Sequence, residues 1–423
     1  MLRLASSRLG FACALLLSAC GSSGGGGGGG APSGGAGGSG NSGGGGVGGN
    51  GGGFPTGPAL ECQSGDVDVT AFAGPGLSVL AFDPVAISHS ITLTGQAAFE
   101  SDPISLCVPQ DAVGLALYGD LTKAVYFSSY VGSGVGDAVD TSSPEALFRF
   151  QSPDVFLPKG PEVKLQPGRH TFKLASETAG QVQPALAIRR GTRGATSHYG
   201  VNLILVDGCG IDASNIQAFA DASTLFDQIY AQVGVVATSV GIGFIHDSSL
   251  AVVAQTNEHV LAEATVEPST QLPLVEQAIN FYFVRELTSD DTAGTLLGHA
   301  MGIPGAPGFP RKAGVVLSVD AHRNGTALDY GAMWITAAHE GGHWHGLRHT
   351  SERWGTMQDL IADTPQCFPE QDLDHDTLVD MVECAGKGAE NLMFWTYDFA
   401  KPPTVLTQGQ GYVLSSALTM NPG

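Results

Sequence analysis

The sequence is poor in basic residues, and beyond residue 20 it contains no long apolar run. It has 19 Lys and Arg residues against 40 Asp and Glu residues, which gives a formal net charge of −21. Proteins bind nucleic acids through basic patches that contact the phosphates, so this balance argues against a nucleic-acid partner. A membrane-spanning helix needs about 20 consecutive apolar residues, and no segment beyond the N-terminus supplies them.

Cysteine is also scarce, with seven in 423 residues. Two lie within the first twenty residues, which leaves Cys62, Cys107, Cys209, Cys367 and Cys384. In an exported protein these five are disulfide candidates. Cys367 and Cys384 are close in sequence, so we expect them to pair. The other three permit three pairings, among which a disulfide from Cys209 to Cys62 or Cys107 is favoured over a metal-ligating thiol at Cys209.

The first twenty residues have the organisation of an export signal. Arg3 and Arg8 give a positive start, residues 9–17 form a short apolar run, and Leu-Ser-Ala-Cys ends it at Cys20. This ending resembles the lipobox of a bacterial lipoprotein, which implies that Cys20 is lipidated. The resemblance implies export and attachment to a membrane, either the outer membrane or the cell surface. The alternative is an ordinary cleaved signal in which Cys20 is incidental.

Residues 21–55 consist almost entirely of Gly, Ser, Ala and Asn. Such a segment has almost no apolar surface to bury, so it is expected to be a flexible tether. A tether of this length has an r.m.s. reach of roughly 30 Å. It is expected to hold a folded body away from the membrane to which Cys20 is attached.

Residues 56–198 read as short β-strands separated by Gly, Pro and Asp. Strand patterns occupy Ile91–Thr94, Val113–Tyr118 and Ala124–Phe127, and residues 165–172 form a turn that leads into another strand. No segment has helical periodicity. The pattern predicts an all-β, sandwich-like domain, whose role as a pro-region, a substrate-binding module or a spacer remains open.

Residues 199–423 alternate between strand and helix patterns, which predicts an α+β domain with a mixed sheet. The last expected strand, at 315–319, is either an edge strand that pairs with a substrate or an ordinary buried strand. The expected strands are Val201–Val206, Val240–Ile245, Ile279–Val284 and Val315–Val319, and the expected helices are Ile216–Val233 and Tyr330–His345.

Residues 339–349, which begin within the second helix, read His-Glu-Gly-Gly-His-Trp-His-Gly-Leu-Arg-His. His339 and His343 are four apart, so on a helix both imidazoles project from one face and reach the same metal ion. Gly346 allows the chain to leave the helix, so that His349 returns as a third ligand. Three histidines leave the fourth tetrahedral position of Zn²⁺ to water.

The residue after the first histidine completes this pattern. Glu340 is placed to take the proton of a zinc-activated water as it attacks a peptide carbonyl, and to pass that proton to the leaving amine. A purely structural zinc site has no use for this carboxylate. His345 lies off the metal-facing side of the helix, so we expect it at the surface or behind the ligands.

The spacing resembles the metzincin zinc peptidases, whose pattern is His-Glu-x-x-His-x-x-Gly-x-x-His. The resemblance implies that His339, His343 and His349 bind zinc and that Glu340 is the general base. Metzincins also have a methionine turn beneath the metal, which Met393 matches within Asn-Leu-Met at 391–393. The implied role of Met393 is packing.

A narrower resemblance is to the pappalysin-like branch of that family. It rests on Asp-Leu-Ile-Ala-Asp-Thr-Pro at 359–365, followed by a cysteine pair, Asn-Leu-Met and Leu-Thr-Gln-Gly-Gln at 406–410. The resemblance covers about residues 200–420 and leaves the β region outside. One departure is Trp395, which stands where many metzincins have a tyrosine. With that tyrosine in doubt, stabilisation of the oxyanion falls to the zinc ion.

Between the last two cysteines, carboxylates alternate along an acidic loop. The alternation is typical of calcium loops, although Thr377 stands where their glycine is expected. A solvated acidic loop is the alternative to a Ca²⁺ site here. The candidate calcium ligands are Asp372, Asp374, Asp376 and Asp380.

These features predict a zinc metalloendopeptidase that acts on extracellular or periplasmic proteins or peptides. The competing hypothesis is a surface-anchored binding or adhesion lipoprotein, in which the β domain is functional and the metal site is vestigial. Glu340 favours the enzyme. The sequence does not reveal the substrate or the oligomeric state.

Overall fold

The fold is taken from a computed structural model, in which strands predominate over a few helices. The predicted signal, Cys20 and the tether lie outside the residues it describes, as do Thr94 and Ala124 at the ends of two predicted strands. No helix in the described part of the chain is both long and apolar enough to cross a membrane. The structure describes residues 58–71, 76–93, 96–120, 125–134, 136–137, 154–264, 266–268, 273–289, 296–307 and 309–422.

The first half of the described chain forms two sheets, in which the only helical element is the 3-10 turn η2 (Val69–Ala71). An eight-stranded sheet has the order β1-β5-β10-β4-β3-β11, with β7 pairing with β10 and β8. Its strands are β1 (Val67–Asp68), β3 (Val85–Leu93), β4 (Gln96–Ser101), β5 (Ile104–Val108), β7 (Tyr126–Gly132), β8 (Gly136–Asp137), β10 (Gly168–Ser176) and β11 (Gly180–Val182). The second sheet has the order β2-β12-β6-β9, with β2 (Gly76–Ala81), β12 (Ala185–Arg190), β6 (Ala112–Tyr118) and β9 (Asp154–Leu157).

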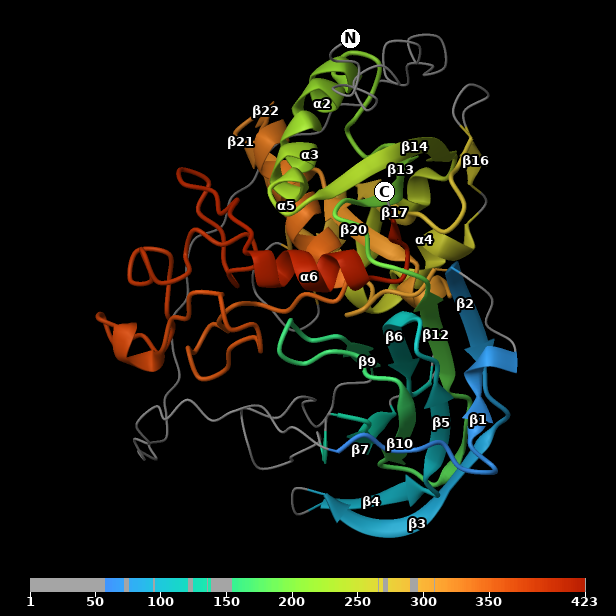
Figure 1. Cartoon of the computed structure of the whole chain (residues 1–423). Helices are drawn as coiled ribbons and strands as arrows, with labels where there is room; N and C mark the ends of the chain where they lie inside the picture. The colour runs from blue at the N-terminus through green and yellow to red at the C-terminus, as the bar shows by residue number, and fades with distance from the viewer. Residues whose placement is uncertain are drawn as a thin grey trace.

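Three strands of the four-stranded sheet, β12, β6 and β9, are largely buried on both faces. Alternate residues of a strand point to opposite faces, so Leu115 and Leu117 of β6 face the eight-stranded sheet. Their neighbours Ala116 and Tyr118 belong instead to the core of the second half of the chain. In Figure 1 this sheet accordingly lies between the rest of the β region and the helices α5 and α6.

The second half is organised around a seven-stranded mixed sheet with the order β16-β14-β13-β17-β20-β19, to which β23 is added alongside β13. Strands β14, β13, β17 and β20 are parallel, whereas β16, β19 and β23 run antiparallel to their neighbours. Strand β20, predicted as either an edge or a buried strand, lies between β17 and β19 and is buried. The strands are β13 (Ser197–Val206), β14 (Val235–Ile245), β16 (Glu267–Pro268), β17 (Ile279–Val284), β19 (Gly298–Ala300), β20 (Gly314–Ser318) and β23 (Asn421–Pro422).

The helix predicted at 216–233 is divided into two, and this expectation was wrong. The hydroxyl of Ser223 donates to the carbonyl of Ala220 at 2.6 Å, a local bond that competes with regular helical pairing. The helices are α2 (Ile216–Ala222), α3 (Thr224–Ala231), α4 (His259–Glu263), α5 (Tyr330–Trp344) and α6 (Gln408–Ser416). Smaller elements are η3 (Ser248–Ala251), β15 (Val252–Ala254), η4 (Gln255–Asn257), β18 (Glu286–Thr288), η5 (Pro310–Lys312), η6 (Asp320–His322), β21 (Arg323–Asn324), β22 (Ala327–Leu328) and η7 (Pro369–Gln371).

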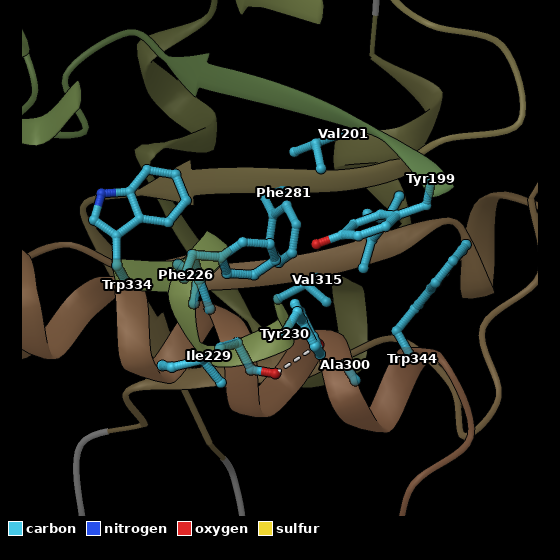
Figure 2. Packing of buried hydrophobic residues seen from close by; sticks show 14 of the residues in the cluster. Tyr199, Val201, Phe226, Ile229, Tyr230, Phe281, Ala300, Val315, Trp334 and Trp344 are labelled. Atoms are coloured by element: carbon cyan, nitrogen blue, oxygen red, sulfur yellow. Dashed lines mark hydrogen bonds between the residues drawn. The ribbon is translucent and has the colours of Figure 1, made fainter. Parts of the chain in front are cut away.

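Helix α5 carries the histidine motif and is held inside the molecule. The carboxylate of Asp329 accepts the N–H of Ala332 at 2.9 Å, which caps the helix where the sequence predicts it to begin. The ring of Trp334 packs on Phe219 of α2, with ring centroids 5.0 Å apart. From α3, the hydroxyl of Tyr230 donates to the carbonyl of Ala338 (Figure 2). Contacts on several sides fix both the position and the rotation of α5.

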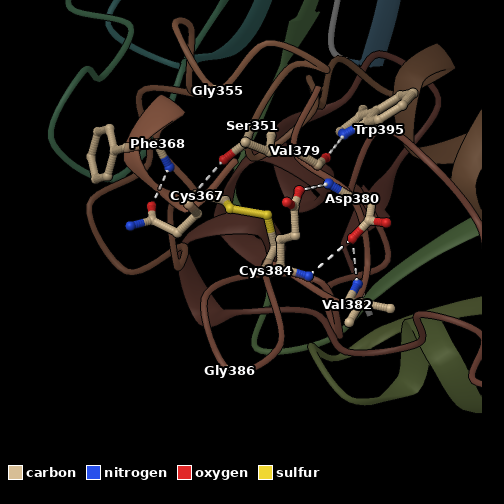
Figure 3. The surroundings of a disulfide bond; sticks show 12 residues. Ser351, Gly355, Cys367, Phe368, Val379, Asp380, Val382, Cys384, Gly386 and Trp395 are labelled. Carbon is tan, nitrogen blue, oxygen red and sulfur yellow. Dashed lines mark hydrogen bonds between the residues drawn. A yellow bond between two sulfur atoms is a disulfide. The ribbon is translucent and has the colours of Figure 1, made fainter. Parts of the chain in front are cut away.

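Two disulfides are present among the residues that the structure describes, and one of them corrects an expectation. Cys367 pairs with Cys384, as predicted, and this disulfide cross-links the loop that follows the histidine motif (Figure 3). Cys62 pairs with Cys107, so the disulfide expected for Cys209 is wrong. Cys209 is a buried thiol in the main core of the second half.

Candidate metal centre

The end of helix α5 turns the chain back towards its own last turn. The N–H of Gly346 donates to the carbonyl of His343, and the N–H of Leu347 donates to that of Gly342. This pair of bonds is a Schellman motif, which needs a residue with positive φ after the helix. Gly346 supplies it with a φ of +104°. The motif therefore directs the following residues, including His349, towards the face that carries the first two histidines.

The three predicted ligands are brought together. A nitrogen of each of His339, His343 and His349 lies within 4.8 Å of the others. The Nε2 atoms of His343 and His349 are 3.1 Å apart. Zinc–nitrogen bonds of about 2.0–2.1 Å at tetrahedral angles place two ligand nitrogens roughly 3.3 Å apart. The cluster therefore fits the size and donor type of a zinc site.

The hydrogen bonds of the three Nδ1 atoms also indicate a metal site. Nδ1 of His339 donates to the carbonyl of Leu392 at 2.6 Å, and Nδ1 of His343 donates to that of Leu347 at 2.9 Å. Nδ1 of His349 lies 3.0 Å from a carboxylate oxygen of Glu352. In its neutral form, each ring carries its proton on Nδ1 and directs a lone pair from Nε2 into the cluster. Lone pairs that face one another repel, and a shared cation removes that repulsion.

Burial keeps the imidazoles of His339 and His343 neutral. It lowers the pKa of His339 to about 3, and the neighbouring His349 lowers it further. Burial also lowers the pKa of His343, with contributions from the two other rings. Since only neutral imidazole binds a metal, the pair is ready to ligate at neutral pH.

The predicted methionine turn lies directly against the helix that carries the ligands. A Cβ added to Gly342 would lie 2.6 Å from Sδ of Met393, so the two are in close contact. The side-chain oxygen of Asn391 accepts the N–H of Met393, and the amides of Asn391 and Gln410 bond reciprocally at 2.9 Å. The carbonyl of Leu392, in the same turn, accepts the hydrogen bond from Nδ1 of His339. This turn therefore supports the cluster both by packing and by hydrogen bonding.

Glu340 faces the edge of the seven-stranded sheet. Its Oε2 accepts the N–H of Ala300, on edge strand β19, at 3.0 Å. Burial raises the pKa of the Glu340 carboxyl above its ordinary value, and the charges of His299 and His349 oppose this shift. A carboxylate with a raised pKa is a stronger proton acceptor.

A cavity of about 250 Å³ opens beside His339 and Glu340. Trp395 and Tyr397 form part of its wall. The indole N–H of Trp395 donates to the carbonyl of Val379 at 2.6 Å, as Figure 3 shows, and so it does not point at the cluster as a donor. The apolar side chains in the wall are Leu296, Leu297, Ile335, Leu392, Phe394 and Pro403.

His345 does not join the three-histidine group. It is 1% exposed and packs edge-on against Tyr199 and Tyr230, which places it behind α5. The expectation that it does not belong among the metal-facing histidines agrees with this position. The sequence left open a surface location, and that part of the expectation was wrong because α3 and β13 cover this side of the helix.

The carboxylates of the predicted calcium loop are grouped differently from the set predicted from the sequence. Asp372 and Asp374 lie with Glu383, each offering an oxygen within 4.8 Å of the others. Asp376 and Asp380 are not in this group. Their carboxylates accept backbone N–H groups, from Leu378 in the first case and from Val382 and Glu383 in the second. Thr377 adopts a φ of +77°, the conformation for which calcium loops use glycine. Calcium binding stays a prediction.

Sequence reasoning missed Glu352 as the partner of His349. Histidine ligands commonly donate their second N–H to a carboxylate, and Glu352 follows His349 by three residues. That spacing was the available signal. The backbone acceptors at Leu347 and Leu392 carry no comparable signal, because every residue has a carbonyl.

Comparison with known proteins gives limited support for a metallopeptidase. No family model matches the chain. Extracellular metalloprotease 1 of Coccidioides posadasii (strain C735) is 32% identical over 146 residues, which are 33% of this chain and 49% of that protein. The chain thus spans about half the length of this curated relative. Metalloproteinase-II from Bacteroides fragilis aligns over 85% of this chain and all of that chain, with a TM-score of 0.29 and 10% identity. A TM-score this low does not establish a shared fold.

Proposed function

We propose that the chain is a zinc-dependent endopeptidase that hydrolyses peptide bonds of extracellular or periplasmic proteins, with Glu340 as the general base. The observation that carries the proposal is the convergence of three Nε2 lone pairs, from His339, His343 and His349, beside the half-buried carboxylate of Glu340. The partial match to a protein named as an extracellular metalloprotease supports it. The metal assigned is zinc, because three imidazoles and one open position suit that ion.

Zinc held by these histidines would supply a Lewis acid and would lower the pKa of water at the open position. Glu340 would hold the proton of the attacking water and deliver it to the leaving amine. The N–H of Ala300 holds one oxygen of this carboxylate, and the other oxygen would accept the proton of the attacking water. Because the indole of Trp395 is bonded to Val379, we assign stabilisation of the oxyanion to the metal and not to a side chain at that position.

Substrate would bind along strand β19. This strand is the edge of the mixed sheet, and an extended peptide can pair with such an edge through its backbone. The cavity beside Glu340, whose wall contains both apolar and polar side chains, would then receive a substrate side chain. Both features agree with the metzincin resemblance. We propose that residues 199–423 form a peptidase domain of the metzincin type, within its pappalysin-like branch.

Export and membrane attachment through Cys20 complete the proposal. Two disulfides are typical of proteins that leave the reducing cytoplasm. The lipobox resemblance supplies the anchor, and residues 21–55 supply the tether. The enzyme would act near the surface to which it is attached.

The proposal is tested by measuring metal and cleavage on the same preparation. The mature chain, purified with zinc supplementation, is expected to hold stoichiometric zinc and to cleave an unstructured protein substrate. Elemental analysis gives the first quantity, and mass spectrometry of the products gives the second. Absence of stoichiometric zinc after supplementation would contradict the proposal and favour the binding-protein alternative.

Removing the carboxylate behind His349 is expected to weaken metal binding. Glu352→Gln replaces a charged acceptor of the Nδ1 proton by a neutral one, so the imidazole becomes a poorer donor to the metal. We expect the zinc Kd to rise about 10- to 100-fold, measured by competition with a chromophoric chelator. The exposed Glu370 provides a control of the same chemistry, since Glu370→Gln is expected to leave the Kd unchanged. An unaltered Kd in Glu352→Gln would show that this pair is only a surface contact.

A further inference from the structure

The β region reaches the metal centre through one face of its four-stranded sheet. Residues of β9 alternate, so Val155 and Leu157 face the core between the two sheets of the β region. Phe156, between them, faces the core that contains α5. Tyr118 of the neighbouring strand β6 points the same way. Two aromatic side chains of the β region are therefore buried in the core of the other half.

Phe156 lies directly on the turn between the second and third histidines. A Cβ added to Gly346 would lie 2.5 Å from Cδ1 of Phe156, which means that the ring touches the glycine backbone. Gly346 holds the positive φ of the Schellman motif that returns His349 to the cluster. The ring occupies the space into which this turn would otherwise relax.

Tyr118 reaches the same end of α5 through the loop after β19. Its hydroxyl donates to the carbonyl of Gly305 at 2.9 Å. The N–H of Gly305 donates in turn to the carbonyl of Trp344, the residue after His343, at 2.8 Å. Loop and helix are in close contact here, since a Cβ on Gly305 would overlap the Trp344 indole. Strand β6 thus supports the last turn of α5.

A buried ion pair joins the two halves at the same place. Nζ of Lys312 lies 2.5 Å from Oδ2 of Asp154 on β9, and the two residues are 8% and 3% exposed. The carbonyl of Lys312 also accepts the indole N–H of Trp344 at 2.9 Å. A buried charge whose partner is removed is strongly destabilising, so this pair favours only the docked arrangement of β9.

We propose that β6 and β9 position the third zinc ligand, with Phe156 as the positioning residue that holds the Gly346 turn in its metal-binding conformation. The β region is then a fixed part of the metal centre and not a pro-region that is removed on maturation. This inference rests on the metal binding assigned above. It differs from simple core filling, because it requires that Phe156 affect zinc affinity and not only stability.

The test compares Phe156→Ala with Phe127→Ala in the full mature chain. Both rings are 1% exposed, but Phe127 packs on Phe172 between the two sheets of the β region, away from α5. The zinc Kd is measured by chelator competition, and the thermal midpoint of the metal-free protein is measured alongside it. We expect Phe156→Ala to raise the Kd about 10- to 100-fold and Phe127→Ala to leave it unchanged, although both lower the midpoint.

Two milder variants keep the test decisive if Phe156→Ala does not fold. Phe156→Leu keeps an apolar side chain on Gly346, and Tyr118→Phe removes only the hydroxyl that bonds to Gly305. Each is expected to raise the Kd by a smaller factor than Phe156→Ala. An unchanged Kd in both, or equal Kd values for Phe156→Ala and Phe127→Ala, overturns the inference while zinc binding by the parent still stands. A parent that binds no zinc overturns the proposed function and this inference together.

Discussion

Replacing Glu340 by glutamine is expected to lower kcat for peptide hydrolysis by about 10²- to 10⁴-fold while leaving the zinc content unchanged. Glutamine has the same shape and keeps an oxygen that accepts the N–H of Ala300, so the fold around β19 and α5 is preserved. It cannot take up the proton of the attacking water. The change therefore removes the base and leaves the three imidazoles in place.

Steady-state cleavage of an unstructured protein, with zinc measured on the same sample, checks this expectation. Glu352→Gln is the matched comparison, because it also replaces a carboxylate by an amide within the site. That variant is expected to lose zinc affinity and to recover cleavage when zinc is saturating, whereas Glu340→Gln is expected to stay inactive at any zinc concentration. If Glu340→Gln cuts as fast as the parent, the proposed mechanism is wrong.

The local parts of the site could be predicted from the sequence because they depend on spacing along one helix. His339 and His343 share a face by helical periodicity, and a glycine at 346 marks the end of the helix. The methionine turn was placed only by resemblance. Its contact with Gly342 joins segments some fifty residues apart, and spacing along the chain does not encode such a contact.

The Cys62–Cys107 disulfide shows why longer-range features were missed. Strand β1 pairs in parallel with β5, with Asp68 opposite Cys107, and a turn in which the N–H of Asp66 donates to the carbonyl of Gln63 brings Cys62 back to its partner. The sequence contains the two cysteines and both strands, but not the choice of β5 as the neighbour of β1. Cys209 remains apart because its position after β13 places it in another core.

The docking of the β region on α5 did leave a signal in the sequence. Residues 112–118 read Ala-Val-Gly-Leu-Ala-Leu-Tyr, and 185–188 read Ala-Leu-Ala-Ile, without the polar alternation of a strand that faces water. Continuous apolar runs indicate strands buried on both faces. The pattern therefore favours a sheet covered by a second body, which a detachable sandwich domain does not require. The identity of the covering element could not be read from it.

Replacing Gly346 by alanine is the second change with a large expected effect. Holding a non-glycine residue at strained positive φ costs about 1–3 kcal/mol, and forcing a methyl group into a packed core costs about 1–3 kcal/mol more. The added Cβ would meet the ring of Phe156 and leave the turn no room to adjust. We expect the metal-free protein to lose stability and the zinc Kd to rise by at least 100-fold, because His349 no longer returns to the cluster.

Gly65 provides the matched control, since its φ is +101° against +104° at Gly346, and an added Cβ there meets nothing within 4 Å. Gly65→Ala should therefore carry only the backbone cost and leave the zinc Kd unchanged. If the collision with Phe156 is the cause, Phe156→Ala should relieve part of the stability loss of Gly346→Ala. The double variant would then be more stable than the sum of the two single changes predicts. Strictly additive stability losses would mean that the backbone strain alone destabilises Gly346→Ala. An unchanged zinc Kd in Gly346→Ala would mean that this turn does not position His349.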